Sequence, residues 1–206
     1  MEPKTTEEIR EIYDGMASWW KWTAIADAIL GMNRLRAKQF RNVTGHVLDV
    51  GCGTGENFPY LPRAESLTAV DLSPAMVEQA NKRAQRMGLD ILIEVGDAAA
   101  LPFHDNTFDF VVTAYSSCTF ADHKSSFLEM ERVTKSGGQI LMVEHGRSSV
   151  SWIAARQDRK IEPHYERSGC RNNREPIDEI NEARLDVKSV RKSHLGMGNR
   201  VRIRVR

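Results

Sequence analysis

Residues 47–57 have the sequence Val-Leu-Asp-Val-Gly-Cys-Gly-Thr-Gly-Glu-Asn, in which a short apolar strand runs directly into a glycine-rich turn. Gly51, Gly53 and Gly55 carry no side chains, so the backbone can turn tightly and lie against a ligand, with helix N–H groups nearby. The common nucleotide fingerprint G-x-G-x-x-G is not met, because Asn57 and Phe58 follow the turn. The turn alone therefore leaves a glycine-rich connection without a ligand as an alternative.

Strand-like and helix-like segments alternate around this turn, which favours an α/β fold with a mostly parallel sheet. Near the C-terminal end, residues 185–194 and 199–206 alternate in part on either side of Gly196-Met197-Gly198, and this pattern is typical of an antiparallel hairpin. Five strands followed by this hairpin predict a sheet of seven strands. The first five predicted strands are residues 46–50, 66–70, 91–95, 108–114 and 139–144.

Helices are predicted between and around these strands. Residues 5–16 have acids in the first turn and Thr5 or Thr6 as the cap. We expect the helix at 74–87 to start after Ser73 and end at Gly88, and the helix at 124–134 to be ended by Ser136-Gly137-Gly138. The remaining predicted helices are residues 18–40, 57–61, 152–166 and 176–183.

Two acids follow the second and third predicted strands. Asp71 comes 20 residues after Gly51, where an acid can accept hydrogen bonds from both hydroxyls of a ribose. The alternative role, capping the next helix, is already filled by Ser73. Asp97 and Ala98 follow the third strand, where they could bind the edge of an adenine, although an ordinary Gly-Asp turn is the alternative.

The composition sets limits on the class of protein. The chain has 206 residues, of which 41% are hydrophobic, and a formal net charge of +1, which fits one domain with a packed core and gives no general attraction to nucleic acid. Three cysteines without a C-x-x-C spacing favour a reducing, cytoplasmic environment. No stretch of about 18 apolar residues and no signal-peptide pattern is present. The charge is uneven, with a net +6 in residues 151–206 and −5 in residues 1–150.

Taken in order, these motifs make residues 45–145 resemble the class I S-adenosylmethionine-dependent methyltransferases. The run Ala69-Val-Asp-Leu-Ser-Pro-Ala-Met-Val looks like the branch of the ubiquinone/menaquinone C-methyltransferases. Ser117-Cys118-Thr119, Glu144-His145 and Leu195-Gly196 look closer to a neighbouring group of phosphatidylethanolamine N- and thiol S-methyltransferase-like proteins, and together these segments resemble a methyltransferase-11-like branch. The resemblance implies a Rossmann-like, seven-stranded, mostly parallel sheet with helices on both faces, strand order 3-2-1-4-5-7-6 and an antiparallel seventh strand. The motifs that carry it are Asp49-Val-Gly-Cys-Gly-Thr-Gly, Val70-Asp71-Leu-Ser-Pro-Ala-Met, Gly96-Asp97-Ala98, Leu101-Pro102-Phe103, Phe108-Asp109 and Ser117-Cys118-Thr119.

The resemblance also implies a cofactor, S-adenosylmethionine, with S-adenosylhomocysteine as its product, and divides the chain by role. Residues 1–44 would form lid helices, 45–145 the cofactor-binding core, and 146–206 the cover on the acceptor side with the terminal hairpin. Tyr13-Asp14 is similar to the family's common start of a lid helix, although Tyr13 as a core aromatic is an alternative. The implied cofactor-binding residues are Tyr13, Asp49, Gly51, Cys52, Gly53, Gly55, Asn57, Asp71, Leu72, Met76, Asp97, Ala98 and Ala114.

The chemistry needs few catalytic groups, because transfer of a sulfonium methyl is an in-line displacement in which the protein mainly aligns the reactants and excludes water. His145 follows the fifth strand and could remove a proton from the acceptor, with a structural histidine as the alternative. Tyr115 is implied to lie near the methyl group. Residues 116–118 could line the acceptor pocket, and Cys118 is not expected to be a nucleophile. No metal site is predicted, since His123 lacks a second histidine at ligand spacing.

The acceptor is expected to be a small or lipid-like molecule, such as a phospholipid amine, a thiol or a quinol. The tryptophans at 19, 20 and 22 could wall an apolar acceptor pocket or lie at a membrane surface, and the basic segment 156–174 could bind an acceptor's phosphate. A packed lid helix and a solvated surface are the respective alternatives. A non-catalytic binding or assembly factor with the same fold is the alternative function, and nucleic acid is not expected as a partner.

Overall fold

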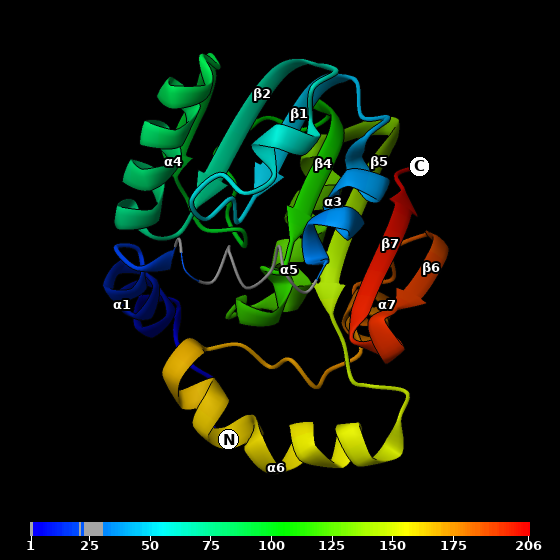
Figure 1. Ribbon diagram of the computed structural model, residues 1–206. Coiled ribbons are helices and arrows are strands. Elements are labelled where there is room, and N and C mark those ends of the chain that lie inside the picture. Colours follow the sequence, from blue (N-terminus) through cyan, green and yellow to red (C-terminus); the bar gives the residue numbers. More distant parts are fainter. Residues whose placement is uncertain (1, 21, 23–30) are drawn as a thin grey trace.

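The computed structural model describes residues 2–20, 22 and 31–206 and contains a sheet of seven strands in the order β3-β2-β1-β4-β5-β7-β6 (Figure 1). All pairings from β3 to β5 are parallel, whereas β7 pairs antiparallel with both β5 and β6. The predicted strand order and hairpin are thus confirmed. The strands are β1 (Gly45–Val50), β2 (Ala64–Asp71), β3 (Ile91–Val95), β4 (Phe108–Ala114), β5 (Thr134–His145), β6 (Val187–Ser193) and β7 (Gly198–Arg204).

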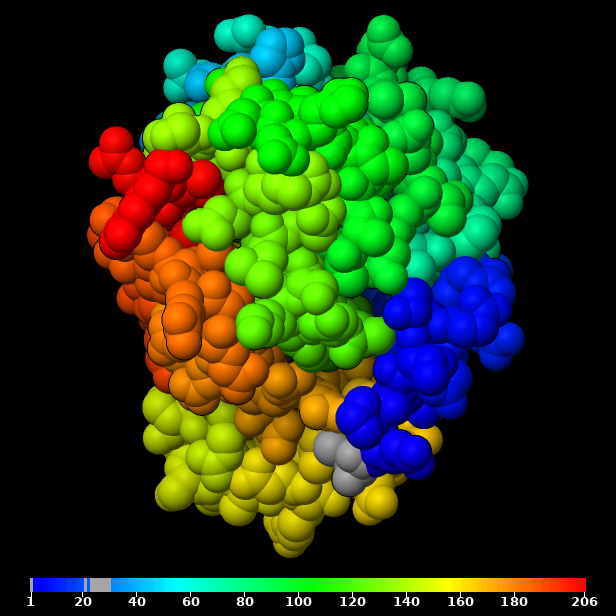
Figure 2. Space-filling model, turned by 180° about the vertical axis from the view of Figure 1, so that it is seen from behind, coloured from blue at the N-terminus to red at the C-terminus, as the bar shows by residue number. Residues whose placement is uncertain are grey.

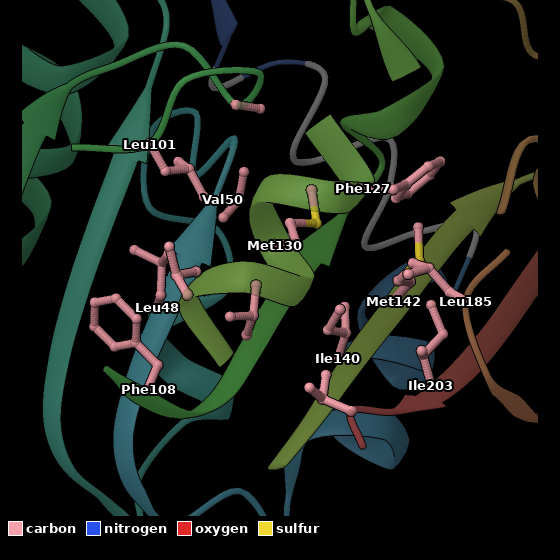
Figure 3. Close-up of a cluster of buried hydrophobic side chains, with 14 of the residues drawn as sticks. Leu48, Val50, Leu101, Phe108, Phe127, Met130, Ile140, Met142, Leu185 and Ile203 are labelled. Atoms are coloured by element: carbon pink, nitrogen blue, oxygen red, sulfur yellow. The ribbon is translucent and has the colours of Figure 1, made fainter. Parts of the chain in front are cut away.

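Both faces of the central strands β1, β4 and β5 are buried, as their nearly continuous apolar sequence requires. On β4, Val111 and Val112 are both fully buried and belong to different clusters, because successive side chains point to opposite faces. One face packs against α5 (His123–Val133) and α7 (Pro176–Glu182), as the cluster around Phe127 and Met130 shows (Figure 3). The other packs against α3 (Met32–Phe40) and α4 (Pro74–Met87).

Capping residues set the helix bounds that the sequence predicts. Thr5 and Glu8 form a capping box at the start of α1 (Thr6–Met16): the Thr5 side chain accepts from the Glu8 N–H, and Glu8 accepts from the Thr5 N–H. Ser73 caps α4 by accepting from the Met76 N–H at 3.1 Å, and Gly88 ends α4 with φ +66°. Thr5, one of the two candidates for the cap of α1, and Ser73, the predicted cap of α4, are both confirmed.

Two predicted helices differ from the structure. The prediction of one helix over residues 18–40 is wrong at its start and at Gly31: residues 17–19 form a turn, and α3 begins only at Met32 because Gly31 takes a left-handed conformation with φ +76°. Trp20 and Trp22 are helical, and α3 ends at Phe40 as predicted. Lys21 and residues 23–30 lie outside the described residues. The Gly137-Gly138 pair does not end a helix: α5 ends at Val133, and both glycines lie inside β5. Gly138 is so close to its neighbours that a β-carbon would lie 2.9 Å from the Asp109 carbonyl oxygen.

The carboxyl ends of the parallel strands are covered by α1 and α6 (Ser151–Ser168) (Figure 1). Seen from behind, residues of α6 form the lower end of the molecule and the N-terminal residues lie beside them (Figure 2). The two segments are in direct contact, because the Lys4 N–H donates to the Tyr165 hydroxyl at 2.8 Å. Gly169, just after α6, is so close to Ile9 that a β-carbon would lie 2.4 Å from its Cδ1 atom. Among the described residues, no helix has the length and apolar character needed to span a membrane.

Candidate active site

A cavity of about 340 Å³ lies at the carboxyl edge of the sheet, between the strand ends and the cover made by α1 and α6. This is the edge of a parallel sheet where ligands bind, and the volume is within the range of small-molecule sites. Thirteen of the fifteen predicted site residues line it. They are Tyr13, Gly51, Cys52, Gly53, Asn57, Asp71, Leu72, Met76, Asp97, Ala98, Ala114, Tyr115 and His145.

The loop after β1 forms one side of the cavity largely from backbone. Gly51 (φ +67°) and Gly53 (φ +54°) take conformations that other residues rarely adopt. A β-carbon at Gly51 would lie 2.6 Å from the Ser116 Cβ atom, whereas nothing lies within 4 Å of the same position at Gly53. The loop therefore tolerates no side chain at Gly51 and presents open backbone at Gly53.

Asp71 connects this loop to the start of α4. Its Oδ2 atom accepts from the Gly53 N–H at 2.7 Å and its Oδ1 atom accepts from the Ser73 N–H at 3.0 Å. Burial raises the pKa of Asp71 even though these two backbone donors act against the shift. Each carboxylate oxygen can accept more than one hydrogen bond, so Asp71 can hold the loop and still bind a hydroxyl in the cavity.

Two predicted binding residues, Asp49 and Gly55, do not line the cavity. Asp49 is fully buried behind the loop, where its Oδ1 atom accepts from the Asn57 side chain at 2.8 Å, and Asn57 accepts in turn from Arg36 at 3.1 Å. Burial raises the pKa of Asp49 to about 7. Gly55 allows close approach of the Phe58 ring, whose Cε2 atom would be 2.4 Å from a β-carbon. In this structure both residues shape the loop from behind.

The side of the cavity next to β2 and β3 combines apolar and polar groups. Leu72 and Met76 line it, and the side chain of Met76, in the first turn of α4, is fully buried. Asp97 and Ala98 lie at the end of β3, with the Asp97 Oδ1 atom accepting from the Ala99 N–H at 2.9 Å. Apolar side chains beside a carboxylate and a free backbone edge can bind a flat heterocycle.

The side of the cavity opposite β2 and β3 is made from larger side chains. Tyr115 follows β4 in a left-handed conformation with φ +58°, which is uncommon for a bulky residue and is often found at functional sites. Its ring centroid lies 4.7 Å from that of His145 and 4.7 Å from the Arg36 guanidinium carbon. Tyr115, His145 and Arg36 all line the cavity, so aromatic, titratable and cationic groups meet at this point.

Tyr13 and Asp14 lie in the last turn of α1 rather than at the start of a helix, because the capping box begins the helix at Thr5. Tyr13 lines the cavity, and burial raises the pKa of its hydroxyl well above the usual range. Asp14 instead accepts from the Ala75 N–H at 3.1 Å and from the Ser73 hydroxyl. A carboxylate at the start of α4 is favourable, and it fixes α1 over the cavity.

Sequence reasoning missed several lining residues that lie far from the glycine loop. Arg36 comes from α3, and the others come from α1 and from the segment just before α5. Residues in these segments have no local spacing that marks them as part of a site. The missed residues are Thr6, Ile9, Met16, Arg36, Thr119, Phe120 and Ala121. Trp20, one of the tryptophans predicted to wall an acceptor pocket, does line the cavity, as do His164, Ser168, Cys170 and Asn172 of the predicted basic segment 156–174.

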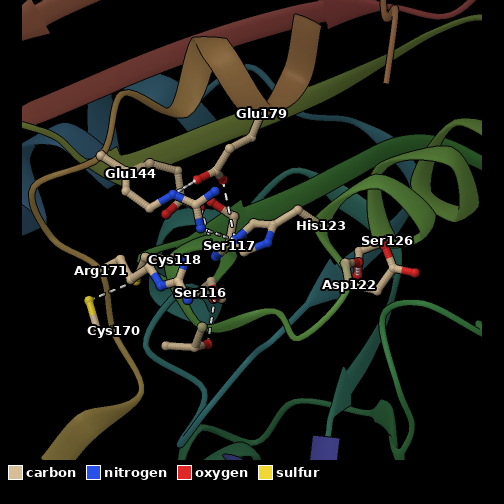
Figure 4. A network of polar contacts seen from close by, with 12 residues as sticks. Ser116, Ser117, Cys118, Asp122, His123, Ser126, Glu144, Cys170, Arg171 and Glu179 are labelled. Atoms are coloured by element: carbon tan, nitrogen blue, oxygen red, sulfur yellow. Dashed lines mark hydrogen bonds and ion pairs between the residues drawn. The ribbon is translucent and has the colours of Figure 1, made fainter. Parts of the chain in front are cut away.

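A buried polar network adjoins the cavity (Figure 4). Glu144 is fully buried and accepts from the Ser117 N–H at 3.4 Å, and burial raises its pKa to about 8. The Cys118 and Cys170 sulfur atoms are 2.9 Å apart, and both thiols are free and buried. Of the predicted pocket residues 116–118, Ser116 lines the cavity, whereas Ser117 and Cys118 do not.

His123 belongs to the same network and not to a metal centre. Its Nε2 atom is 3.4 Å from the Glu179 Oε2 atom and 3.1 Å from the Arg174 guanidinium. Burial and the nearby Arg174 and Arg171 lower the pKa of His123 to about 4. Among the described residues, no group of three or more His, Cys, Asp or Glu side chains is arranged to hold a metal ion.

Part of the chain is similar in sequence to known methyltransferases. Residues 48–142 match the family model described as a methyltransferase domain. The phosphatidylethanolamine N-methyltransferase of Cereibacter sphaeroides is 35% identical over 103 residues, which cover 49% of this chain and 51% of that protein. A demethylmenaquinone methyltransferase of Renibacterium salmoninarum is 32% identical over 148 residues, 68% of this chain and 60% of that protein.

The fold extends beyond the matched sequence. A crystal structure of an S-adenosylmethionine-dependent methyltransferase from Thermotoga maritima superposes with a TM-score of 0.76 at 19% identity, covering 96% of this chain and 100% of that one. This superposition shows that the chain has the Rossmann-like fold of that structure. Residues 48–142 therefore contain a methyltransferase domain, and in this part the chain is similar to S-adenosylmethionine-dependent methyltransferases. It spans about half the length of the curated relatives that it matches.

Proposed function

We propose that the chain binds S-adenosylmethionine in the cavity at the carboxyl edge and catalyses transfer of its methyl group to a small or lipid-like acceptor. The observation that carries the proposal is the arrangement of Gly51, Gly53 and Asp71, where a loop free of side chains lies beside a buried carboxylate. Matching residues 48–142 to the methyltransferase domain supports it. The bound cofactor would supply a methyl group already activated by a sulfonium.

Each side of the cavity fits a different part of the cofactor. Asp71 would accept hydrogen bonds from the ribose hydroxyls, with Leu72 and Met76 against the adenine and Asp97 and Ala98 at its edge. The open backbone at Gly53 would allow close approach of the remaining chain of the cofactor. Asn57, which is 2% exposed and fixed by Arg36, would form the floor beneath it.

The acceptor would enter on the side of Tyr115 and His145. These residues would place the acceptor atom in line with the methyl group, and α1 and α6 would exclude water. His145 would take a proton from an acceptor that must lose one. A phospholipid amine, a thiol and a quinol are the acceptor classes proposed, since similar proteins carry the names phosphatidylethanolamine N-methyltransferase and demethylmenaquinone methyltransferase.

Calorimetric titration with S-adenosylhomocysteine tests the cofactor half of the proposal. Wild-type protein should bind it, and Asp71→Asn should weaken binding about 10- to 100-fold, because a charged acceptor of two hydrogen bonds is lost. Asp90→Asn is the matched control, since Asp90 is exposed and does not line the cavity. Equal affinity of Asp71→Asn and wild type in folded protein would contradict the assignment.

Turnover tests the catalytic half and separates it from the alternative of a non-catalytic binding or assembly factor. Transfer of labelled methyl to ethanolamine phospholipids, thiols or quinols should be detected with wild-type protein. For an acceptor that loses a proton, His145→Asn should lower kcat by about 10²- to 10⁴-fold and leave the affinity for S-adenosylhomocysteine unchanged. Binding of the cofactor without turnover of any of these acceptors would favour the non-catalytic alternative.

A further inference from the structure

A groove of about 510 Å³ runs along α6 next to the cavity. Two residues, His164 and Asn172, line both the groove and the cavity, so the two spaces adjoin at these side chains. A ligand held in the groove can therefore extend toward Tyr115 and His145. The complete set of groove residues is Ile153, Arg156, Gln157, Lys160, Pro163, His164, Arg167, Asn172 and Met197.

The groove is basic because of the spacing of residues along α6. Arg156, Lys160 and Arg167 recur at intervals of four and seven residues, which places them on one face of the helix. All three are exposed, and none of them forms an ion pair with another described residue. The groove thus collects three cationic groups on the side of α6 that adjoins the cavity.

The acidic residues of α6 lie on other faces. Asp158 pairs with Arg147 at 2.7 Å, and Glu166 pairs with Lys4 at 3.0 Å. None of the residues that line the groove is acidic. No acidic side chain of the groove therefore neutralises its cations, although α6 as a whole contains nearly as many acidic as basic residues.

The floor of the groove is held in place by hydrogen bonds. The Gln157 side-chain nitrogen donates to the Gly146 and Asn172 carbonyl oxygens, both at 3.2 Å, and its oxygen accepts from the Ser148 N–H at 2.8 Å. These bonds connect α6 to the segment that leaves β5 and to the segment that contains Asn172. The distance between the cationic face and the cavity is thus set by the fold.

We propose that this groove binds the phosphate of the methyl acceptor while the atom to be methylated lies in the adjoining cavity. The inference rests on the proposed methyltransferase function and specifies its acceptor as a phosphomonoester or phosphodiester. Arginine guanidinium groups match the geometry of phosphate oxygens, and a lysine adds a further donor. The phosphate could belong to a lipid headgroup or to a soluble metabolite, and both present the same chemistry to Arg156, Lys160 and Arg167.

The test uses protein saturated with S-adenosylhomocysteine and two phosphate probes. The soluble probe is sn-glycerol 3-phosphate, followed by ³¹P line broadening, with glycerol as a competitor that lacks the phosphate. The lipid probe is a vesicle of phosphatidic acid, followed by sedimentation and compared with a vesicle of digalactosyldiacylglycerol, a bilayer lipid without phosphate. The variant Arg156→Gln/Lys160→Gln/Arg167→Gln removes the groove cations. Arg159→Gln/Lys38→Gln/Lys124→Gln removes the same charge from exposed residues outside the groove.

Wild-type protein should bind a phosphate probe, the groove variant should bind it about tenfold more weakly, and the control variant should match wild type. Groove-dependent binding of the soluble probe alone indicates a soluble phosphorylated acceptor, and groove-dependent binding of the vesicle indicates a lipid headgroup. The proposal is overturned if neither probe binds, or if the groove and control variants weaken binding equally, while S-adenosylhomocysteine still binds. If wild-type protein does not bind S-adenosylhomocysteine, the result instead contradicts the proposed function.

Discussion

The two sides of the cavity are built in different ways. The side formed by the loop after β1 presents backbone, small residues and the buried Asp71. The side formed by α1, α6 and the end of β5 presents large aromatic and titratable side chains, among them Tyr13, His145 and His164. The first side can bind one fixed ligand through main-chain geometry, whereas the second can change its chemistry by single substitutions without altering the backbone.

The difference follows from where each side lies in the sequence. The loop side comes from neighbouring strands within residues 48–142, the part that matches the methyltransferase domain. The other side brings together segments that are far apart, as shown by the hydrogen bond between Lys4 and Tyr165, 161 residues along the chain. In the proposed function, the contiguous part would bind the cofactor and the part assembled from distant segments would select the acceptor.

The largest expected effect concerns the side of the cavity that is formed by the backbone of the loop after β1. Gly51→Ala should lower the free energy of unfolding by about 3 kcal/mol, because the alanine must keep a left-handed conformation and its β-carbon overlaps Ser116. Gly53→Ala carries only the conformational cost of about 1 kcal/mol, since the space around it is open. Urea unfolding of the two variants checks the prediction, and equal losses would show that Ser116 moves aside.

A second prediction uses the pH dependence of stability to compare two buried carboxyl groups, Asp49 behind the loop and Glu144 on β5. Burial raises the pKa of Asp49 to about 7 and that of Glu144 to about 8. Between about pH 5 and its raised pKa, each group holds a proton in the folded protein but not in the unfolded chain, so each lowers stability as the pH rises, by at most about 1.4 kcal/mol per pH unit. Below about pH 6.5 the lowered pKa of His123 acts in the opposite direction and offsets one of the two. Above this window both states are ionised and the slope disappears.

Variants separate the two contributions. Glu144→Gln should flatten the decline up to about pH 8, and Asp49→Asn should flatten it only up to about pH 7, because each amide cannot ionise. Urea unfolding across the pH range measures both slopes. A Glu144→Gln variant with the slope of wild type would show that Glu144 is ionised in the folded protein.

The smallest expected effect concerns the contact that holds the assembled side together. Tyr165→Phe removes the hydroxyl that accepts from the Lys4 N–H at 2.8 Å, and should cost about 1 kcal/mol of stability. Tyr60→Phe is the control, since the Tyr60 hydroxyl makes no hydrogen bond with the described residues. Faster hydrogen exchange at the Lys4 amide in Tyr165→Phe alone supports the contact, and equal exchange in both variants contradicts it.

The sheet and the loop side of the site could be predicted because their signals are local. Apolar runs, glycine spacing and an acid after a strand placed Gly51, Gly53, Asp71 and Asp97 at one sheet edge. The contact between the free thiols of Cys118 and Cys170 could not be predicted, because the two residues are 52 positions apart and meet only through tertiary packing. The break at Gly31 was missed for a different reason, since apolar periodicity continues through it while the backbone does not.

The position of β7 between β5 and β6 has a consequence for how the sheet forms. β6 pairs only with β7 among the described strands, and β7 follows β6 in the chain, so β6 stays unpaired until the later strand is in place. Val201 and Ile203 of β7 are fully buried and pair with Met142 and Ile140 of β5, a contact between distant parts of the chain. Such non-local pairing slows folding, and until it is complete β5 remains an apolar edge open to other chains.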